Sequence, residues 1–180
     1  GRRRLLSGLL ELPSRAGPRR DTALFAHLEG MPVVSPGHTH SDLLEHGWCW
    51  RIPLPGKTSL GLVVHGDTLA RYGSTNEEQY DRYLAEERNI RAFGGAPKRV
   101  SPVLRYNNYQ MLTLRGFGSG WALCGDAFGF VDPVFSSGVL LALKSGVMAG
   151  EAVHQAIIEK NFAPERFAGY ARYLRAGVEN

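Results

Sequence analysis

The chain has 180 residues, of which 43% are apolar, and a formal net charge of +4. This length is enough for one domain, or two small ones, with a real hydrophobic core. Six arginines against one glutamate place +5 in residues 1–20 and leave −1 for the remainder. Because no aromatic residue is interleaved with these arginines, we expect a solvated basic surface and no nucleic-acid partner.

The cysteines and the apolar runs indicate the cellular setting of the protein. Cys49 and Cys124 are the only cysteines and both lie in strand-like apolar stretches, so we expect no disulfide framework and a cytoplasmic, reducing setting. The longest apolar run, residues 139–143, is stopped by Lys144, which predicts no integral membrane segment. The chain begins without Met and ends within an expected helix, residues 164–175, so we expect a fragment at both ends.

In chain order, the first 115 residues favour antiparallel strands over strand–helix–strand units. Residues 1–20 read as a basic helix or loop, residues 22–30 as a strand, and residues 31–40 as a Pro/Gly-rich loop. Strand character returns at 43–54 and, after a Pro-Gly-Lys turn, at 58–65, which predicts a hairpin. Thr75 and Glu78 form a capping-box pattern for a helix through about residue 93. Residues 100–109 are a further strand candidate, which residues 112–114 extend.

The most informative stretch is residues 120–150. Residues 121–124 are a short apolar run typical of a strand buried on both faces, and Gly125 and Asp126 end it. Ser136 and Ser137 then open a long apolar segment, from residue 139 onward, that predicts a buried helix. A strand, a carboxylate at its end and a helix N-terminus together make a polar cradle for a ligand in an α/β protein. We therefore expect a binding site here.

The residues of this stretch resemble the second nucleotide-binding signature of FAD-dependent monooxygenases and flavin-dependent halogenases. The signature is close to G-D-A-x-G-F-x-D-P-x-x-S-x-G. The halogenase element F-x-x-P-x-x-S-x-G is complete within it. The matching residues are Gly125, Asp126, Ala127, Gly129, Phe130, Asp132, Pro133, Ser136 and Gly138.

A second motif strengthens the resemblance. Trp48 and Trp50 are two residues apart on an expected strand, so their indoles project from one face while Cys49 and Arg51 point the other way. The stretch matches W-x-W-x-I-P, which is associated with flavin-dependent halogenases. Paired tryptophans on a sheet also occur in ordinary cores, but their position before the first motif favours a wall of a substrate site.

The resemblance implies an α/β fold, or α+β as a fragment. It would combine part of an FAD-binding Rossmann-like domain with an antiparallel β-sheet substrate domain, as in the PHBH-like flavoprotein fold. It implies an FAD-domain helix or loop at 1–20, a substrate domain at 21–115 with a helix at 76–93, and an FAD-binding strand-turn-helix at 116–160. The start of a C-terminal helical region would follow at 161–180.

The resemblance also implies the site residues and the cofactor, FAD. Those expected to bind it are Gly125, Asp126, Pro133, Ser136, Ser137 and Gly138. Of these, Asp126 would hold the ribityl chain, and Ser137 and Gly138 would also hold a halide. Trp48, Trp50 and Phe135 would line the substrate pocket. No metal is expected, since the histidines at 38, 40 and 46 lack a recognised ligand spacing.

The activity implied is oxidation of an aromatic substrate with reduced flavin and O2, by halogenation or by direct oxygen transfer. A separate flavin reductase is a partner in such systems. Tryptophan halogenases carry a glutamate where this chain has Phe135, which favours phenol or pyrrole substrates, in some enzymes tethered to a carrier protein. A geranylgeranyl-reductase-type flavin oxidoreductase and a non-catalytic binding module stay open as alternatives. No G-x-G-x-x-G opens a helix here, so we expect that motif, and the halogenase lysine, upstream.

Overall fold

The computed structural model describes residues 4–33, 35–107 and 110–179. The chain divides into two compact units. Arg19–Asn108 form the first, which we call the sheet unit, and Gly1–Pro18 together with Tyr109–Asn180 form the second, which we call the helical unit. Segments from both ends of the chain therefore build the helical unit.

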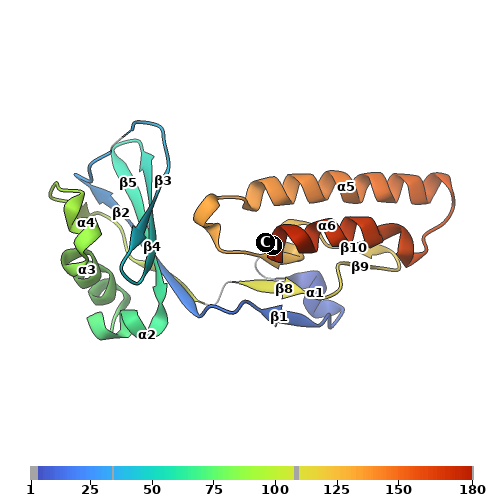
Figure 1. The fold of residues 1–180 in the computed structure, drawn as a ribbon, viewed down its shortest axis with the longest axis horizontal. Coiled ribbons are helices and arrows are strands. Elements are labelled where there is room, and N and C mark those ends of the chain that lie inside the picture. The colour runs from blue at the N-terminus through green and yellow to red at the C-terminus, as the bar shows by residue number, and fades with distance from the viewer. Residues whose placement is uncertain (1–3, 34, 108–109, 180) are drawn as a thin grey trace. The chain divides into compact units, whose positions relative to one another are not determined.

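One antiparallel sheet dominates the sheet unit (Figure 1). Its order is β3-β4-β5-β2-β6, and β7 also pairs with β2. The predicted hairpin is confirmed, because Leu54 pairs with Lys57 across the tight turn between β4 and β5. The strands are β2 (Asp21–Glu29), β3 (His40–Leu44), β4 (Gly47–Leu54), β5 (Lys57–His65), β6 (Lys98–Arg99) and β7 (Leu104–Asn107).

Short helices cover one face of this sheet (Figure 1). Alternate residues of the strands, such as Leu24, Leu60 and Leu62, form a buried core with Tyr80 and Tyr83 of α3. This pattern follows from the two-residue period of a strand, which sends every second side chain to the same face. The helices are α2 (Gly66–Leu69), the 3-10 helix η1 (Ala70–Tyr72), α3 (Asn76–Glu86) and α4 (Arg88–Ala92).

Three predictions in the sheet unit need correction. The strand expected at 43–54 is two strands, because a turn at 45–46 separates β3 from β4. The helix expected to reach residue 93 breaks at Glu87, whose backbone is extended and whose carboxylate accepts hydrogen bonds from Ile90 N (2.7 Å) and Glu45 N (3.1 Å). Of the strand expected at 100–109, 104–107 form β7, and 108–109 lie outside the described residues. The capping box at Thr75 and Glu78 is confirmed.

The helical unit combines two small sheets with two long helices. The core lies between the helices and the strands and contains Leu112, Leu123, Phe128, Tyr170 and Leu174. Figure 1 shows α6 running beside α5. Its strands are β1 (Ser14–Ala16), β8 (Met111–Thr113) and β11 (Gly129–Phe130) in one sheet, and β9 (Phe117–Gly118) with β10 (Trp121–Ala122) in the other. Its helices are α1 (Leu5–Leu9), η2 (Gly125–Ala127), η3 (Pro133–Phe135), α5 (Gly138–Ile158), η4 (Pro164–Phe167) and α6 (Ala168–Glu179).

Three predictions are wrong in the helical unit. The strand expected at 121–124 is only two residues long, because after Ala122 the chain leaves β9 and enters η2. Residues 112–114 do not extend β7, since β8 belongs to a separate sheet. The helix expected to be buried begins as predicted, but one face of α5 is exposed: Leu140 and Leu143 keep 66% and 67% of their surface accessible. Small residues such as Ser145 and Ala149 form its buried face.

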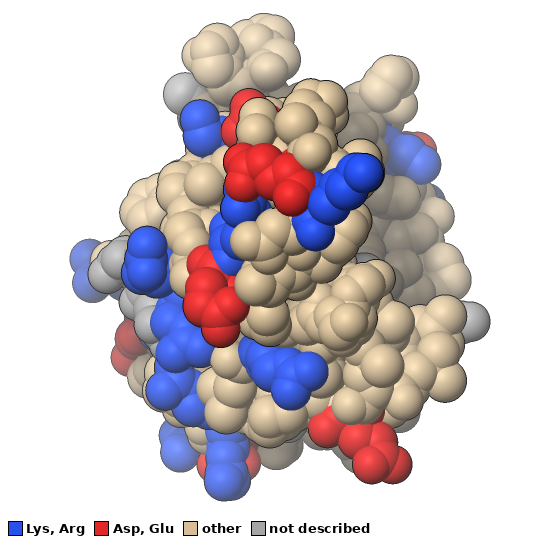
Figure 2. Space-filling model, turned by 90° about the vertical axis from the view of Figure 1, so that its right-hand side faces the viewer, with Lys and Arg blue, Asp and Glu red and all other residues tan. Residues whose placement is uncertain are grey.

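On the face in Figure 2, Lys and Arg gather toward the lower left with a few Asp and Glu among them, and broad uncharged areas cover much of the rest. Within the described residues, every helix is too short or too polar to cross a membrane. The described part of the chain contains no group of three or more His, Cys, Asp or Glu side chains placed to hold a metal ion.

Candidate functional site

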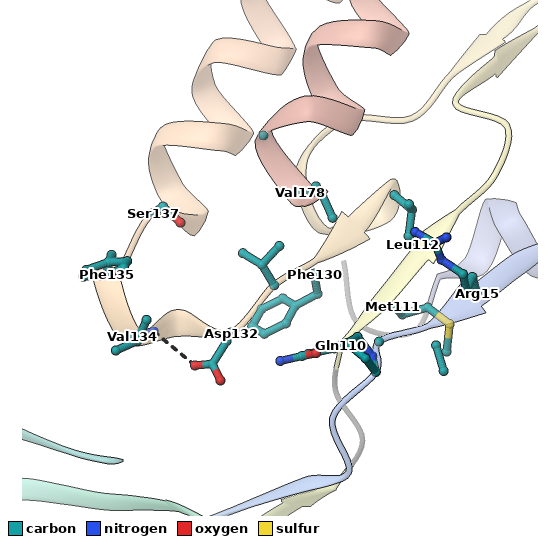
Figure 3. A pocket seen from close by; sticks show the side chains of 15 residues that line it. Arg15, Gln110, Met111, Leu112, Phe130, Asp132, Val134, Phe135, Ser137 and Val178 are labelled. Carbon is teal, nitrogen blue, oxygen red and sulfur yellow. Dashed lines mark hydrogen bonds between the residues drawn. The ribbon is translucent and has the colours of Figure 1, made fainter. Parts of the chain in front are cut away.

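The first motif folds as a tight turn, a short strand and a second turn that leads into α5. Gly125 opens η2, and β11 follows. Asp132 then caps the N-terminus of η3, and its Oδ1 accepts a hydrogen bond from Val134 N at 3.3 Å (Figure 3). Pro133 is the first residue of η3, where its missing N–H leaves no hydrogen bond unmade. Ser136 takes a left-handed conformation with φ of 53° and turns the chain into Ser137, the residue before α5.

The N-terminus of α5 is open. Among the described residues, no side chain caps it, and its first helical bond runs from Leu141 N to Ser137 O (3.0 Å). The N–H groups of the first turn therefore lack helical acceptors. A Cβ placed on Gly138 would meet nothing within 4 Å. The positive end of a 21-residue helix dipole and free N–H groups suit an anion or the electron-rich edge of a ring.

The turn at Gly125 and Asp126 lies against the same helix. Gly125 has a φ of 51°, and a Cβ there would come within 2.9 Å of the Ala142 Cβ, so only glycine permits this close approach. The Gly125 N–H donates to the Ser145 hydroxyl at 3.0 Å. The half-buried Asp126 has no hydrogen bond or ion pair with any described residue, so its carboxylate is free to accept hydrogen bonds from a ligand.

A cavity of about 790 Å³ lies within the helical unit (Figure 3). The size falls in the range of small-molecule and cofactor sites. Of the predicted site residues, Ser137 and Phe135 line it, whereas Gly125, Asp126, Pro133, Ser136 and Gly138 are not among its described lining residues. The lining residues are Arg15, Ala16, Gly17, Pro18, Gln110, Met111, Leu112, Phe130, Val131, Asp132, Val134, Phe135, Ser137, Gly177 and Val178.

Sequence reasoning missed the wall opposite the motif. Arg15 and Gln110 contribute polar groups there, and Figure 3 shows the Gln110 side chain extending toward the loop that carries Asp132. Gly17 leaves room for the Gln110 side chain, because a Cβ on Gly17 would lie 2.3 Å from the Gln110 Oε1. No local motif marks these residues. They meet because β1 and β8 pair in antiparallel register although about 95 residues separate them, and only the fold reveals that pairing.

The second motif forms an aromatic face on the sheet unit. As predicted, Trp48 and Trp50 project from the same face of β4. Their ring centroids lie 5.9 Å apart. Phe25 of β2 continues the row at 5.7 Å from Trp50, and Tyr106 of β7 lies 5.5 Å from Phe25. Neighbouring rings in this row are tilted by 46° to 50° to one another, and Trp48 is 8% exposed, so the row is a packed aromatic cluster. Phe135 belongs to the helical unit, so its grouping with the two tryptophans stays a prediction.

The opposite face of β4 is a buried structural layer. Arg51 is 4% exposed and makes a two-pronged ion pair with Asp42, at 2.8 Å through Nε and 3.0 Å through Nη2. Its guanidinium also lies 3.8 Å from the centroid of the Phe93 ring. Beside it, burial raises the pKa of the Cys49 thiol to about 12. A neutral buried thiol and a fully paired arginine support the sheet and offer no reactive group.

Comparisons with known proteins agree with the two motifs. The family model described as tryptophan halogenase matches residues 18–180. The 1H-pyrrole-2-carbonyl-[peptidyl-carrier protein] chlorinase of Pseudomonas fluorescens is 31% identical over 134 residues, which cover 74% of this chain and 30% of that protein. The tetracycline 7-halogenase of Kitasatospora aureofaciens is 31% identical over an alignment of 204 positions, which covers 95% of this chain and 35% of that protein. The chain thus spans about a third of the length of these curated relatives.

The fold leads to the same family. The crystal structure of CmlS, a flavin-dependent halogenase, superposes with a TM-score of 0.84 at 28% identity, covering 97% of this chain and 32% of that one. The expected flavoprotein fold, which joins helices to an antiparallel sheet, is therefore confirmed. Since the family model, the relatives, the fold and both motifs concur, this chain belongs to the tryptophan halogenase family, whose members include flavin-dependent halogenases.

Proposed function

We propose that the chain is part of an FAD-dependent halogenase and that its helical unit holds the flavin. The observation that carries this proposal is the joint placement of two features on α5: the Asp126 turn lies against the helix, and the uncapped helix N-terminus begins beside the cavity. Both features are open to a ligand. These two features fit FAD, because the Asp126 carboxylate can accept hydrogen bonds from hydroxyl groups and the N–H groups of the helix can donate to ring oxygens and nitrogens.

The roles follow from the chemistry of each group. Asp126 would accept hydrogen bonds from the ribityl hydroxyls, and Gly125 allows the turn to approach α5 closely. Pro133 and Ser136 shape the loop that presents Ser137 and Gly138. The N–H groups of Ser137 and Gly138 would donate to the electron-rich edge of the flavin ring or to a halide anion. When bound, reduced FAD supplies the means to activate O2 for oxidation of the halide or for oxygen transfer to a ring.

We further propose that the substrate is an aromatic ring of the phenol or pyrrole type. Phe135, which is 88% exposed, stands where tryptophan halogenases carry a glutamate, and it offers ring packing without proton transfer. The Trp48 and Trp50 face provides a second apolar wall. The Pseudomonas fluorescens relative acts on a pyrrole ring held on a peptidyl carrier protein, which supports a carrier-tethered substrate. A separate flavin reductase would supply the reduced cofactor.

We assign residues 1–20 and 116–160 to the FAD-binding domain and residues 161–180 to the start of a C-terminal helical region. Residues 21–115 then form the substrate domain, although 109–115 belong to the helical unit. The association of Gly1–Pro18 with Tyr109–Asn180 in one compact unit supports the first assignment. The aromatic face of the sheet unit supports the second.

The proposal is tested by FAD binding to the complete natural polypeptide and to two variants. Asp126→Ala removes a carboxylate that has no partner among the described residues, so we expect FAD to bind about tenfold more weakly while thermal stability without FAD changes little. Asp67→Ala, at an exposed position on the sheet unit, is the matched control. Equal FAD affinity for the Asp126 variant and the parent would overturn the assignment.

Product analysis then separates the activities. Incubation with reduced FAD, O2 and chloride or bromide should convert phenol or pyrrole substrates, free or carrier-tethered, to halogenated products. Hydroxylated products that form equally without halide would assign the chain to the monooxygenases. FAD binding without any oxygenated or halogenated product would favour the reductase type.

A further inference from the structure

Ser145 connects the Asp126 turn to the middle of α5. Its side chain is fully buried, and its hydroxyl accepts a hydrogen bond from Gly125 N at 3.0 Å while it donates to Ala142 O, also at 3.0 Å. The second bond directs the oxygen lone pairs toward the turn. Ser145 lies two helical turns beyond Gly138, so one rigid helix carries both this anchor and the open N-terminus.

The anchored turn has little freedom. A Cβ on Gly125 would lie 2.9 Å from the Ala142 Cβ and 3.1 Å from its Cα, so the turn already touches the helix. On the other side, the buried Tyr170 hydroxyl donates to Leu123 O, two residues before Gly125. The hydroxyl of Ser145 supplies the acceptor that the buried Gly125 N–H needs. Without it, the turn must shift to find another acceptor or leave the donor unpaired.

We propose that Ser145 is a positioning residue for FAD, which sets the place of the Asp126 carboxylate relative to the N-terminus of α5. Asp126 follows Gly125 directly, and its side chain has no hydrogen-bond or ion-pair partner among the described residues, so its position depends on the turn. This inference rests on the proposed function, since it concerns how the proposed flavin ligand is held. Because Ser145 is fully buried, we expect it to act through the turn and without contact to FAD.

A double-mutant cycle distinguishes positioning from a general contribution to folding. FAD affinity is measured by flavin fluorescence for the complete polypeptide and for the variants Ser145→Ala, Asp126→Ala and the double variant. If Ser145 acts through Asp126, Ser145→Ala weakens FAD binding about tenfold in the parent but less than twofold in the Asp126→Ala background.

Ser101→Ala is the matched control. Ser101 also accepts from a backbone N–H, that of His27 at 2.9 Å, but lies in the sheet unit. The Ser101→Ala variant should lower the melting temperature of the FAD-free protein about as much as Ser145→Ala does, and it should leave FAD affinity unchanged.

The possible failures differ. Equal losses from Ser145→Ala in both backgrounds, or no loss in the parent, overturn the positioning role while FAD binding by the parent upholds the proposed function. If Ser145→Ala fails to fold, Ala142→Val takes its place in the cycle. The larger valine side chain should displace Gly125 while the Ser145 hydroxyl stays present. Absence of FAD binding by the parent overturns the proposed function and this inference together.

Discussion

The indole of Trp50 lies directly over Gly61 of the neighbouring strand. The two residues are paired in register between β4 and β5, and a Cβ on Gly61 would lie 2.0 Å from the indole Cζ2. The indole Nε1 donates to the Ser59 hydroxyl at 3.2 Å, which holds the ring across β5 and toward Phe25. The absence of a side chain at Gly61 thus sets the orientation of the aromatic face.

Replacement of Gly61 by alanine should turn Trp50 out of this position. We expect a loss of near-UV circular dichroism from the coupled rings and a destabilisation of about 1–3 kcal/mol, because the methyl group and the indole compete for one space. Urea unfolding measures the second effect. Gly169→Ala is the control, since a Cβ there meets nothing within 4 Å and α6 gains helix propensity. An unchanged near-UV spectrum in Gly61→Ala would contradict the prediction.

The exposed apolar face of α5 should behave as a contact surface. Leu140, Leu143 and Val147 lie on it with more than half of their surface accessible. The isolated 180-residue chain should therefore bind a dye such as ANS, and Leu143→Glu should reduce that binding with a stability change within about 0.5 kcal/mol.

The same change in the complete polypeptide provides the comparison. If other parts of the protein cover this face, Leu143→Glu costs about 2–3 kcal/mol there, because a charge replaces a buried leucine. Lys144→Glu, at the neighbouring exposed position, is the control for charge alone. An equally small effect of Leu143→Glu in both forms would show that the face stays exposed.

Cys49 should resist thiol reagents until the sheet unit unfolds. It is fully buried, and burial raises its pKa to about 12, so only about one part in 10⁴ is thiolate at pH 8. In a Cys124→Ser variant, labelling by a disulfide reagent should be negligible in buffer and complete in guanidinium chloride. The Cys49→Ser variant retains the partly exposed Cys124 and should react faster under native conditions. Rapid native labelling of Cys49 would disagree with the described core.

The capping box should make α3 sensitive to acid. Hydrogen bonds from the backbone N–H groups of Ser74 and Thr75 to the Glu78 carboxylate lower its pKa from the usual 4.5. A lowered pKa in the folded state means that the stabilisation is present above pH 4.5 and is lost as the pH falls through the folded-state value.

Glu78→Ala should therefore lower the melting temperature at pH 7, and the difference from the parent should shrink below about pH 4. Glu86→Ala, in the last turn of the same helix, is the control and should show no such convergence. A difference that stays constant down to about pH 3 would mean that charge plays no part in the cap.

The sequence predicted those features whose causes lie within a few neighbouring residues. The capping box pairs Thr75 with a residue three positions later, and the β4–β5 hairpin follows from its tight turn. The shared face of Trp48 and Trp50 follows from the strand period. The start of α5 after Ser137 follows from local helix signals. Each of these signals acts over one turn or one strand, so no long-range contact can reverse it easily.

Only the tertiary structure revealed what depends on contacts between distant segments. It placed the Ser145 hydroxyl on Gly125, twenty positions away, and it set Gly61 beneath Trp50. It brought Arg15 and Gln110 to one cavity wall through the pairing of β1 with β8. The sequence by itself determined the family motifs and their local folds, because these depend on backbone geometry and spacing. The exposure of α5 and the partners of each site residue were decided by packing, because side-chain surroundings depend on which segments meet in space.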